Sequence, residues 1–181
     1  MASEQPSYQI ISDARFSSDP AMELRLYDRL LTASLNVRAP TWRAASSASF
    51  NLLAGYIFGQ NNRQERIGMT SPVATQKTER GWQVHFFMPS RYASVNLPQP
   101  ADGRIQISVR PALSVAAIRF NGAVSGMAGE VNFAKAEERL RAALKKAGIE
   151  IDGLPIYAVY DGPYTRAFMR RNEVMLPVRL D

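Results

Sequence analysis

The sequence predicts an α+β fold in which two units of strand, strand, helix, strand, strand form a bent antiparallel sheet or distorted barrel with two flanking helices. Three observations predict it: segments that alternate apolar and polar residues, two stretches with helical spacing of apolar residues, and the same order of segments in both halves. Because a helix covers only one face of a small sheet, the two halves are expected to pack into one body.

The first unit begins with MELRLYDR at 22–29, whose alternation predicts a half-buried strand, and LLTASLNV at 30–37 follows as a second apolar segment. A helix comes next, and GYIFGQNN supplies the Gly and Asn residues that typically end one. The apolar stripe of this helix, at spacings i, i+3, i+4 and i+7, consists of Phe50, Leu53, Ala54 and Ile57. Strand-like segments at 67–77 and 82–88 complete the unit.

The second unit repeats this order. RIQISVR at 104–110 alternates like the first strand, and LSVAAIRF follows it. An apolar stripe from Phe133 to Ala147 predicts the second helix, which Gly148 ends because glycine tolerates positive φ. Two further strand-like segments cover 155–161 and 172–180.

These boundaries predict the domain organisation. Residues 1–20 are expected to form an N-terminal arm in which YQII is an edge strand. Residues 21–181 are expected to form a single domain of two pseudo-repeats, 21–88 and 104–180. The Pro-rich segment MPSRYASVNLPQPADG joins them, because its prolines cannot donate to a sheet ladder.

Composition restricts the functional class. The 181 residues include no cysteine and one histidine, which removes disulfides, thiolate zinc sites and cysteine nucleophiles. The net charge of +6 suits an acidic partner, but the basic residues form small clusters without a nucleic-acid motif, so no nucleic-acid partner is expected. No apolar run approaches the ~20 residues needed to span a membrane. We expect a soluble protein, cytoplasmic, or periplasmic if a leader was removed, and its oligomeric state stays open.

The single histidine, His85, lies in the strand-like segment WQVHFFM. Alternation places it on the same face as Gln83 and Phe87, opposite the apolar set. Metal sites usually need several converging donors, so His85 is expected to be a half-exposed strand residue and not a metal or haem ligand.

Four separated segments carry a family resemblance. MELRLYD near the start, LLAGYIFGQNNRQERIGMTSPV at 52–73, FFMPSRY at 86–92 and YDGPYTRAFMRRNEVML at 160–176 closely resemble the SOUL haem-binding protein family in order and spacing. The resemblance spans about residues 8 to 180. It implies the duplicated fold and the binding of haem or another tetrapyrrole.

The resemblance also implies where the ligand would lie. In one branch of the family a histidine in the first strand is the proposed iron ligand, and Leu26 stands at that position here. In another branch haem is thought to lie in an apolar groove along the first helix, with basic residues meeting its propionates. The matching positions here are Ser47, Gly55 and Thr165, so the cationic part is largely absent. The residues that remain for cofactor binding are Phe50, Leu53, Ala54, Ile57, Arg43 and Arg166.

Two alternatives stay open. The helix stripe is also what packing on a sheet requires, and exposure in the folded protein distinguishes a groove from a core face. In function, the sequence favours a non-enzymatic carrier or buffer that binds a tetrapyrrole without a dedicated axial histidine. The alternative is a small-molecule effector-binding module, as in bacterial regulators, which requires a buried carboxylate such as Glu173 or Glu23. An enzyme finds no support, because no nucleophile–base pair, paired carboxylates or phosphate loop is recognisable.

Overall fold

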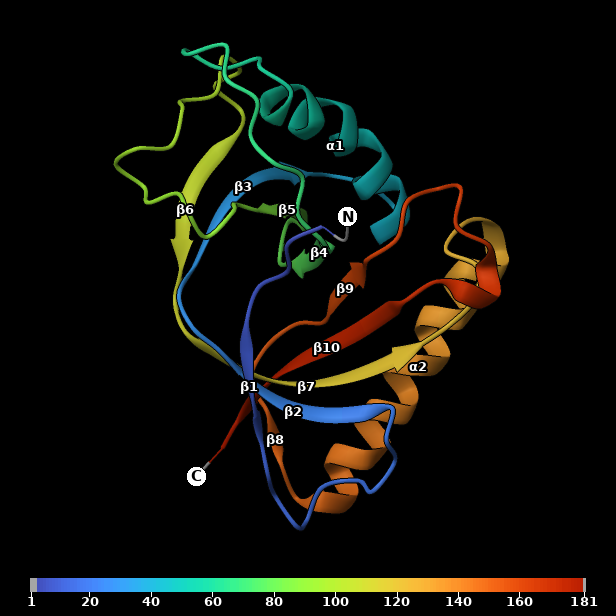
Figure 1. The fold of residues 1–181 in the computed structure, drawn as a ribbon. Helices are drawn as coiled ribbons and strands as arrows, with labels where there is room; N and C mark the ends of the chain where they lie inside the picture. Colours follow the sequence, from blue (N-terminus) through green and yellow to red (C-terminus); the bar gives the residue numbers. More distant parts are fainter. Residues whose placement is uncertain (1–2, 181) are drawn as a thin grey trace. The chain divides into compact units, whose positions relative to one another are not determined.

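A computed structural model describes residues 3–180 and contains two α-helices and antiparallel strands, which confirms the α+β class (Figure 1). The elements follow one another as β1 (Tyr8–Ile11), β2 (Met22–Tyr27), β3 (Leu30–Val37), α1 (Trp42–Ile57), β4 (Val73–Thr78), β5 (Gly81–Phe87), β6 (Gln106–Arg110), β7 (Leu113–Phe120), α2 (Gly126–Ala147), β8 (Glu150–Ile151), β9 (Ile156–Val159), the 3₁₀ turn η1 (Ala167–Met169) and β10 (Asn172–Arg179). Neither helix in this described part is long and apolar enough to cross a membrane.

Contacts group the chain into two compact units that do not follow the two sequence repeats. Unit 1 is mostly Arg29–Pro111, and unit 2 combines Ser7–Asp28 with residues 112–180. The first strand of each repeat has therefore changed places: β2 pairs with β7 of the second repeat, and β6 pairs with β3 of the first. Each spatial unit contains residues of both predicted repeats, so the repeats 21–88 and 104–180 remain a prediction about the organisation of the sequence.

Unit 1 is a four-stranded sheet with strand order β4-β5-β3-β6 and with α1 on one face. Alternation along β3 and β5 sends Ala33, Leu35, Val84 and Phe86 into the core beneath the helix. The helix begins after Thr41, whose side chain accepts a hydrogen bond from the Ala44 amide at 3.2 Å.

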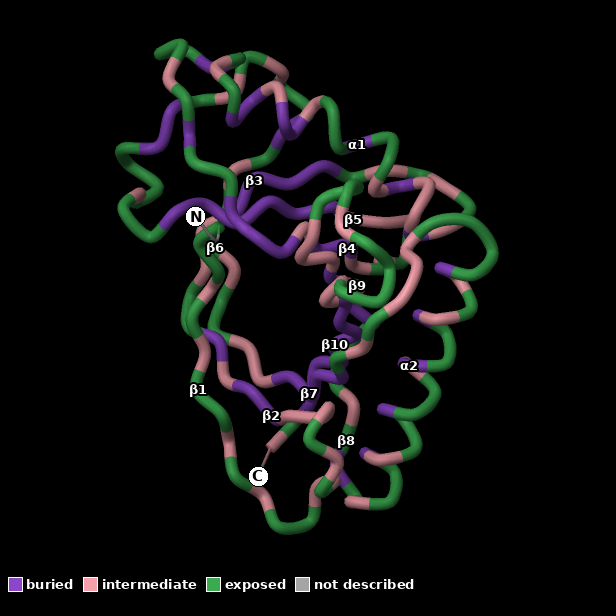
Figure 2. The backbone as a smooth tube through the Cα atoms, turned by 45° about the vertical axis from the view of Figure 1, so that its right-hand side comes forward, coloured by how far each residue is buried: buried purple, intermediate pink, exposed green. Residues whose placement is uncertain are grey.

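Unit 2 has the strand order β1-β2-β7-β10-β9, with the short β8 paired to the end of β10. The predicted edge strand YQII is confirmed as β1. Helix α2 turns its buried residues toward this sheet (Figure 2), and its Phe133 ring contacts Phe120 and Tyr157 at centroid distances of 4.8 and 5.7 Å. Gly148 ends α2 with φ of 69°, as the sequence predicted.

The prediction that β2 is only half buried is wrong. Leu24 lies on one face and Arg25 on the other, and each is 1% exposed. Alternation identified the two faces correctly, but it assigned the polar face to solvent. That face carries buried ion pairs instead, which a polar residue type alone does not reveal.

Candidate functional site

The apolar stripe of α1 divides into a core part and an exposed part. Leu53 and Ile57 are 0% and 1% exposed and belong to the core of unit 1. Ala54 is buried outside that core cluster, whereas Phe50 is 40% exposed. The Phe50 ring packs on the buried Phe86 with 5.6 Å between centroids. Phe50 is thus the stripe residue that offers apolar surface to a ligand.

The two predicted cationic residues lie in different units. Arg43 is half-buried in the first turn of α1, and Arg166 is exposed just before η1 in unit 2. Tyr164, Phe168 and Met169 are strongly exposed around Arg166. Along α1, Ser47 is exposed, and Gly55 lies close to the side chain of Gln60. Neither Ser47 nor Gly55 carries a charge that could meet a propionate.

A hollow of about 450 Å³ opens beside the last turns of α1. Its walls come from Leu52 and Tyr56 of the helix and from the two loops around Gln60 and Asp102. None of the six predicted binding residues lines this hollow. The predicted groove and the hollow are therefore separate features of unit 1.

His85 is buried, so the prediction of a half-exposed histidine is wrong. The side chain is 2% exposed and lies on β5 between Ser34 of β3 and Ala74 of β4, on the face away from α1. Neither ring nitrogen has a hydrogen-bond partner among the residues that the structure describes. Burial, with a smaller effect from the charge of Arg110, lowers the pKa of His85 to about 3, and the imidazole is neutral.

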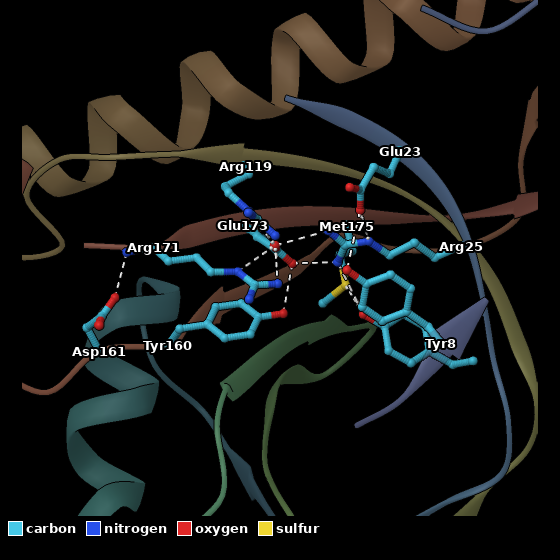
Figure 3. A network of polar contacts seen from close by, with 10 residues as sticks. Tyr8, Glu23, Arg25, Arg119, Tyr160, Asp161, Arg171, Glu173 and Met175 are labelled. Carbon is cyan, nitrogen blue, oxygen red and sulfur yellow. Dashed lines mark hydrogen bonds and ion pairs between the residues drawn. The ribbon is translucent and has the colours of Figure 1, made fainter. Parts of the chain in front are cut away.

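A buried ionic network occupies the face of the unit 2 sheet opposite α2 (Figure 3). Its centre is Glu173 of β10, which is 0% exposed. Arg25 of β2 donates to both Glu173 oxygens, at 2.7 and 3.1 Å. Arg171 Nη2 donates to Oε1 at 2.8 Å, and the Tyr160 hydroxyl donates to Oε2 at 2.8 Å. Both carboxylate oxygens are thus fully engaged.

Further contacts hold the network in place. Arg25 Nε donates to Glu23 at 2.8 Å, and its guanidinium lies 4.3 Å from the centre of the Tyr8 ring. Arg171 stacks on Tyr160 at 3.8 Å. Burial works to raise the pKa of Glu173, but the hydrogen bonds and charges of Arg25 and Arg171 outweigh it, so this pKa is lowered. Glu173 is therefore an ionised structural partner.

Within the segment RRNEV, Arg171 and Glu173 form an ion pair, and Glu173 is fully buried. Arg170 does not join it, because its guanidinium donates to the carbonyl oxygens of Thr165 and Pro163. Sequence reasoning missed Arg25, although its place at the centre of MELRLYD, one of the recognised segments, was an available signal.

The described residues contain no group of three or more His, Asp or Glu side chains arranged to hold a metal ion.

The sequence profile described as SOUL heme-binding protein matches residues 3–177. The chain belongs to this family. Mus musculus heme-binding protein 2 is 27% identical over 188 residues, which cover 97% of this chain and 86% of that protein. Xenopus laevis heme-binding protein 1 is 29% identical over 164 residues, covering 85% and 82%.

Solved structures share the fold of this SOUL family member. The C-terminal domain of EcmrR superposes with a TM-score of 0.65 at 15% identity, over 95% of this chain and 98% of that one. SAV2435 bound to tetraphenylphosphonium gives a TM-score of 0.52 at 14% identity, over 87% and 93%. At such identities these similarities concern the fold alone.

Proposed function

We propose that this protein binds haem or a related tetrapyrrole as a carrier or buffer, with the macrocycle lying against the exposed side of α1. The observation that carries the proposal is the family match over residues 3–177, together with relatives named as heme-binding proteins. The role proposed is binding and not catalysis.

The geometry of α1 supports an apolar contact for the macrocycle. Phe50 keeps 40% of its surface exposed, and its ring is held by Phe86 from the core below. A ring fixed in this way can stack on a flat macrocycle at little entropic cost. In the proposal Leu53 and Ile57 support the helix from the core, Ala54 flanks Phe50, and Arg43 in the first turn of α1 is the candidate to meet a propionate.

The proposed site has no axial histidine. His85 is the chain's single histidine, and it is buried on the face of the unit 1 sheet that points away from α1. A macrocycle on the exposed side of α1 lies across the sheet from this imidazole. The proposal therefore rests on shape, apolar contact and propionate charge.

Magnitudes place the expected affinity in the micromolar range. Burying roughly 400 Å² of porphyrin face at about 25 cal/mol/Å² gives on the order of 10 kcal/mol, before association costs of about 4 kcal/mol upward. One or two charge-assisted contacts to the propionates add about 1.5–3 kcal/mol each.

The test is a titration of purified protein with protoporphyrin IX, followed by porphyrin fluorescence and absorbance. We expect Phe50→Ala to weaken binding about tenfold, because stacking on the ring is lost. The matched control is Val131→Ala on α2, where an apolar residue of similar exposure, 42%, is truncated away from α1. Equal affinities of Phe50→Ala and the wild type would remove α1 from the proposal.

The effector-module alternative is not favoured. An effector module for organic cations needs a buried carboxylate whose negative charge is not already paired. Glu173 is buried, as this alternative expects. Its charge is already matched by Arg25 and Arg171, and Glu23 is matched by Arg25 as well. A cationic ligand would have to displace a guanidinium from a buried ion pair. Breaking such a pair costs several kcal/mol.

A further inference from the structure

The face of the unit 1 sheet away from α1 is polar and contains a buried side chain without a partner. Cross-strand pairing places His85 next to Ser34 and, one pair along the same face, places Gln76 next to Gln83. His85 is 2% exposed, and neither Nδ1 nor Nε2 has a hydrogen-bond partner in the described chain. An imidazole buried in this way is costly unless a water molecule or a ligand supplies the missing hydrogen bonds.

Arg110 brings a positive charge to the same face. It lies on β6, and its Nη2 donates to Gln76 Oε1 of β4 at 2.8 Å. Strands β4 and β6 are the outermost strands of this four-stranded sheet, so the hydrogen bond passes over β5 and β3 and shows that the face is concave. Arg110 has no carboxylate within ion-pair distance among the described residues.

The charged groups on this face are few. On β3, β4 and β5 the side chains that share the face with His85 are uncharged, including Ser34, Gln76 and Gln83. On β6 Arg110 supplies the cation, and the remaining face positions are Gln106 and Ser108. Both of these are exposed, which marks β6 as the side from which a small molecule can reach the face.

We propose that this concave face binds the carboxylate group of a small molecule, with Arg110 as its ionic partner and His85 as a hydrogen-bond donor. A guanidinium matches a carboxylate because its N–H groups form a fork that contacts both oxygens. A neutral imidazole contributes one N–H donor. One cation suits a singly charged group, whereas a phosphate dianion is better matched by several cations or a helix N-terminus.

This site is independent of the proposed tetrapyrrole site. His85 and Arg110 lie across the sheet from α1, so a carboxylate bound between them does not contact Phe50. We therefore expect Phe50→Ala to leave carboxylate binding unchanged.

The single histidine gives a direct measurement. In protein without a histidine tag, the ring Cε1–H signal in a ¹H–¹³C NMR spectrum belongs to His85 alone. Octanoate and benzoate are titrated at constant ionic strength, with benzamide as the neutral counterpart and inorganic phosphate as the dianion. We expect a saturable shift of this signal with the carboxylates and none with benzamide. The pKa of His85 should also rise from about 3 when the carboxylate is bound, because an adjacent anion favours the imidazolium.

Variants assign the cation. Arg110→Gln should weaken carboxylate binding at least about tenfold, and Arg110→Lys should weaken it less, because the charge stays and the fork is lost. Arg104→Gln, at an exposed arginine paired with Asp102 in the same unit, is the control that should bind normally. The proposal is overturned if the wild type shows no saturable shift with either carboxylate, if phosphate shifts the signal at lower concentration, or if Arg110→Gln binds as the wild type does. The wild-type titration decides the matter even where Arg110→Gln does not fold.

Discussion

At Glu173 one carboxylate neutralises a guanidinium that has almost no contact with solvent. Arg25 is 1% exposed, and its two hydrogen bonds to Glu173 are its principal ionic contacts together with Glu23. Forming such a pair is expensive, because both groups lose their hydration, but breaking it leaves an uncompensated buried charge. The network therefore adds little to the net stability of the fold, but removing one of its charged groups is strongly destabilising.

We expect Glu173→Gln to lower the free energy of unfolding by about 3–5 kcal/mol, since the buried Arg25 loses its buried counter-charge and keeps only the partly exposed Glu23. Urea denaturation monitored by circular dichroism measures this. Glu150→Gln is the matched control, because Glu150 pairs with Arg179 at the surface and exposed pairs contribute only about 0–1 kcal/mol. Similar losses in the two variants would contradict the structural role of the network.

His85 makes stability depend on pH in a defined direction. Its pKa is about 3 in the folded chain, against the ordinary 6.5 expected when unfolded. Below pH 6.5 the unfolded state binds one proton that the native state does not, so native stability is lost as pH falls and is unaffected at higher pH.

The expected result is a difference between wild type and His85→Gln in how the free energy of unfolding varies with pH. Between about pH 6 and pH 4 the wild type should lose about 1.4 kcal/mol per pH unit more than the variant, and above pH 7.5 the two curves should run parallel. Urea unfolding at a series of pH values measures both slopes. Parallel curves throughout would show that His85 is not the neutral buried group described.

At the scale of elements, the two helices begin differently. Thr41 caps α1 through its hydroxyl, which accepts from the Ala44 amide, whereas Ser125 precedes α2 without a side-chain capping bond. We expect Thr41→Ala to destabilise the protein by about 1 kcal/mol and Ser125→Ala to have little effect. Thermal unfolding of the two variants compares them directly, and an equal loss in both would contradict the capping assignment.

The sequence predicted the elements better than their partners. The segments LLTASLNV and LSVAAIRF are β3 and β7 with the expected bounds, because alternation and β-branched residues are local signals. The pairing of β2 with β7 joins residues about 90 positions apart in the sequence. The pairing of β6 with β3 joins, for example, Thr32 and Ser108, which are 76 positions apart. No local sequence pattern specifies either pairing. Apart from the short β8, the strands follow one another in the predicted order, while their pairing came from the structure alone.

The candidate site was less predictable for a physical reason. Periodicity placed Phe50 and Leu53 on one stripe, but a helix flank and a helix core face differ by only about 60° of rotation, which the stripe does not resolve. Similarly, His85 and Arg25 were placed on the correct faces, yet their burial depends on what covers a face. Polar residues on a curved sheet can be buried by partners from distant strands, as Arg25 is by Glu173.

For the molecule as a whole, the proposed function makes iron coordination unnecessary. A tetrapyrrole held against α1 by stacking on Phe50 and by propionate contacts should bind whether or not it contains iron. The single histidine is buried across the sheet, so it cannot add a coordinate bond to a ligand at that position. The relative affinity of metal-containing and metal-free macrocycles is therefore the property that distinguishes this account from axial ligation.

The most direct test compares dissociation constants for haemin and metal-free protoporphyrin IX, measured under the same conditions with the same preparation. We expect micromolar values that agree within about threefold, and a broad Soret band for haemin that His85→Ala leaves unchanged. Haemin binding about a hundredfold tighter, with a sharp low-spin Soret band that His85→Ala abolishes, would contradict it, as would the absence of saturable binding for both macrocycles.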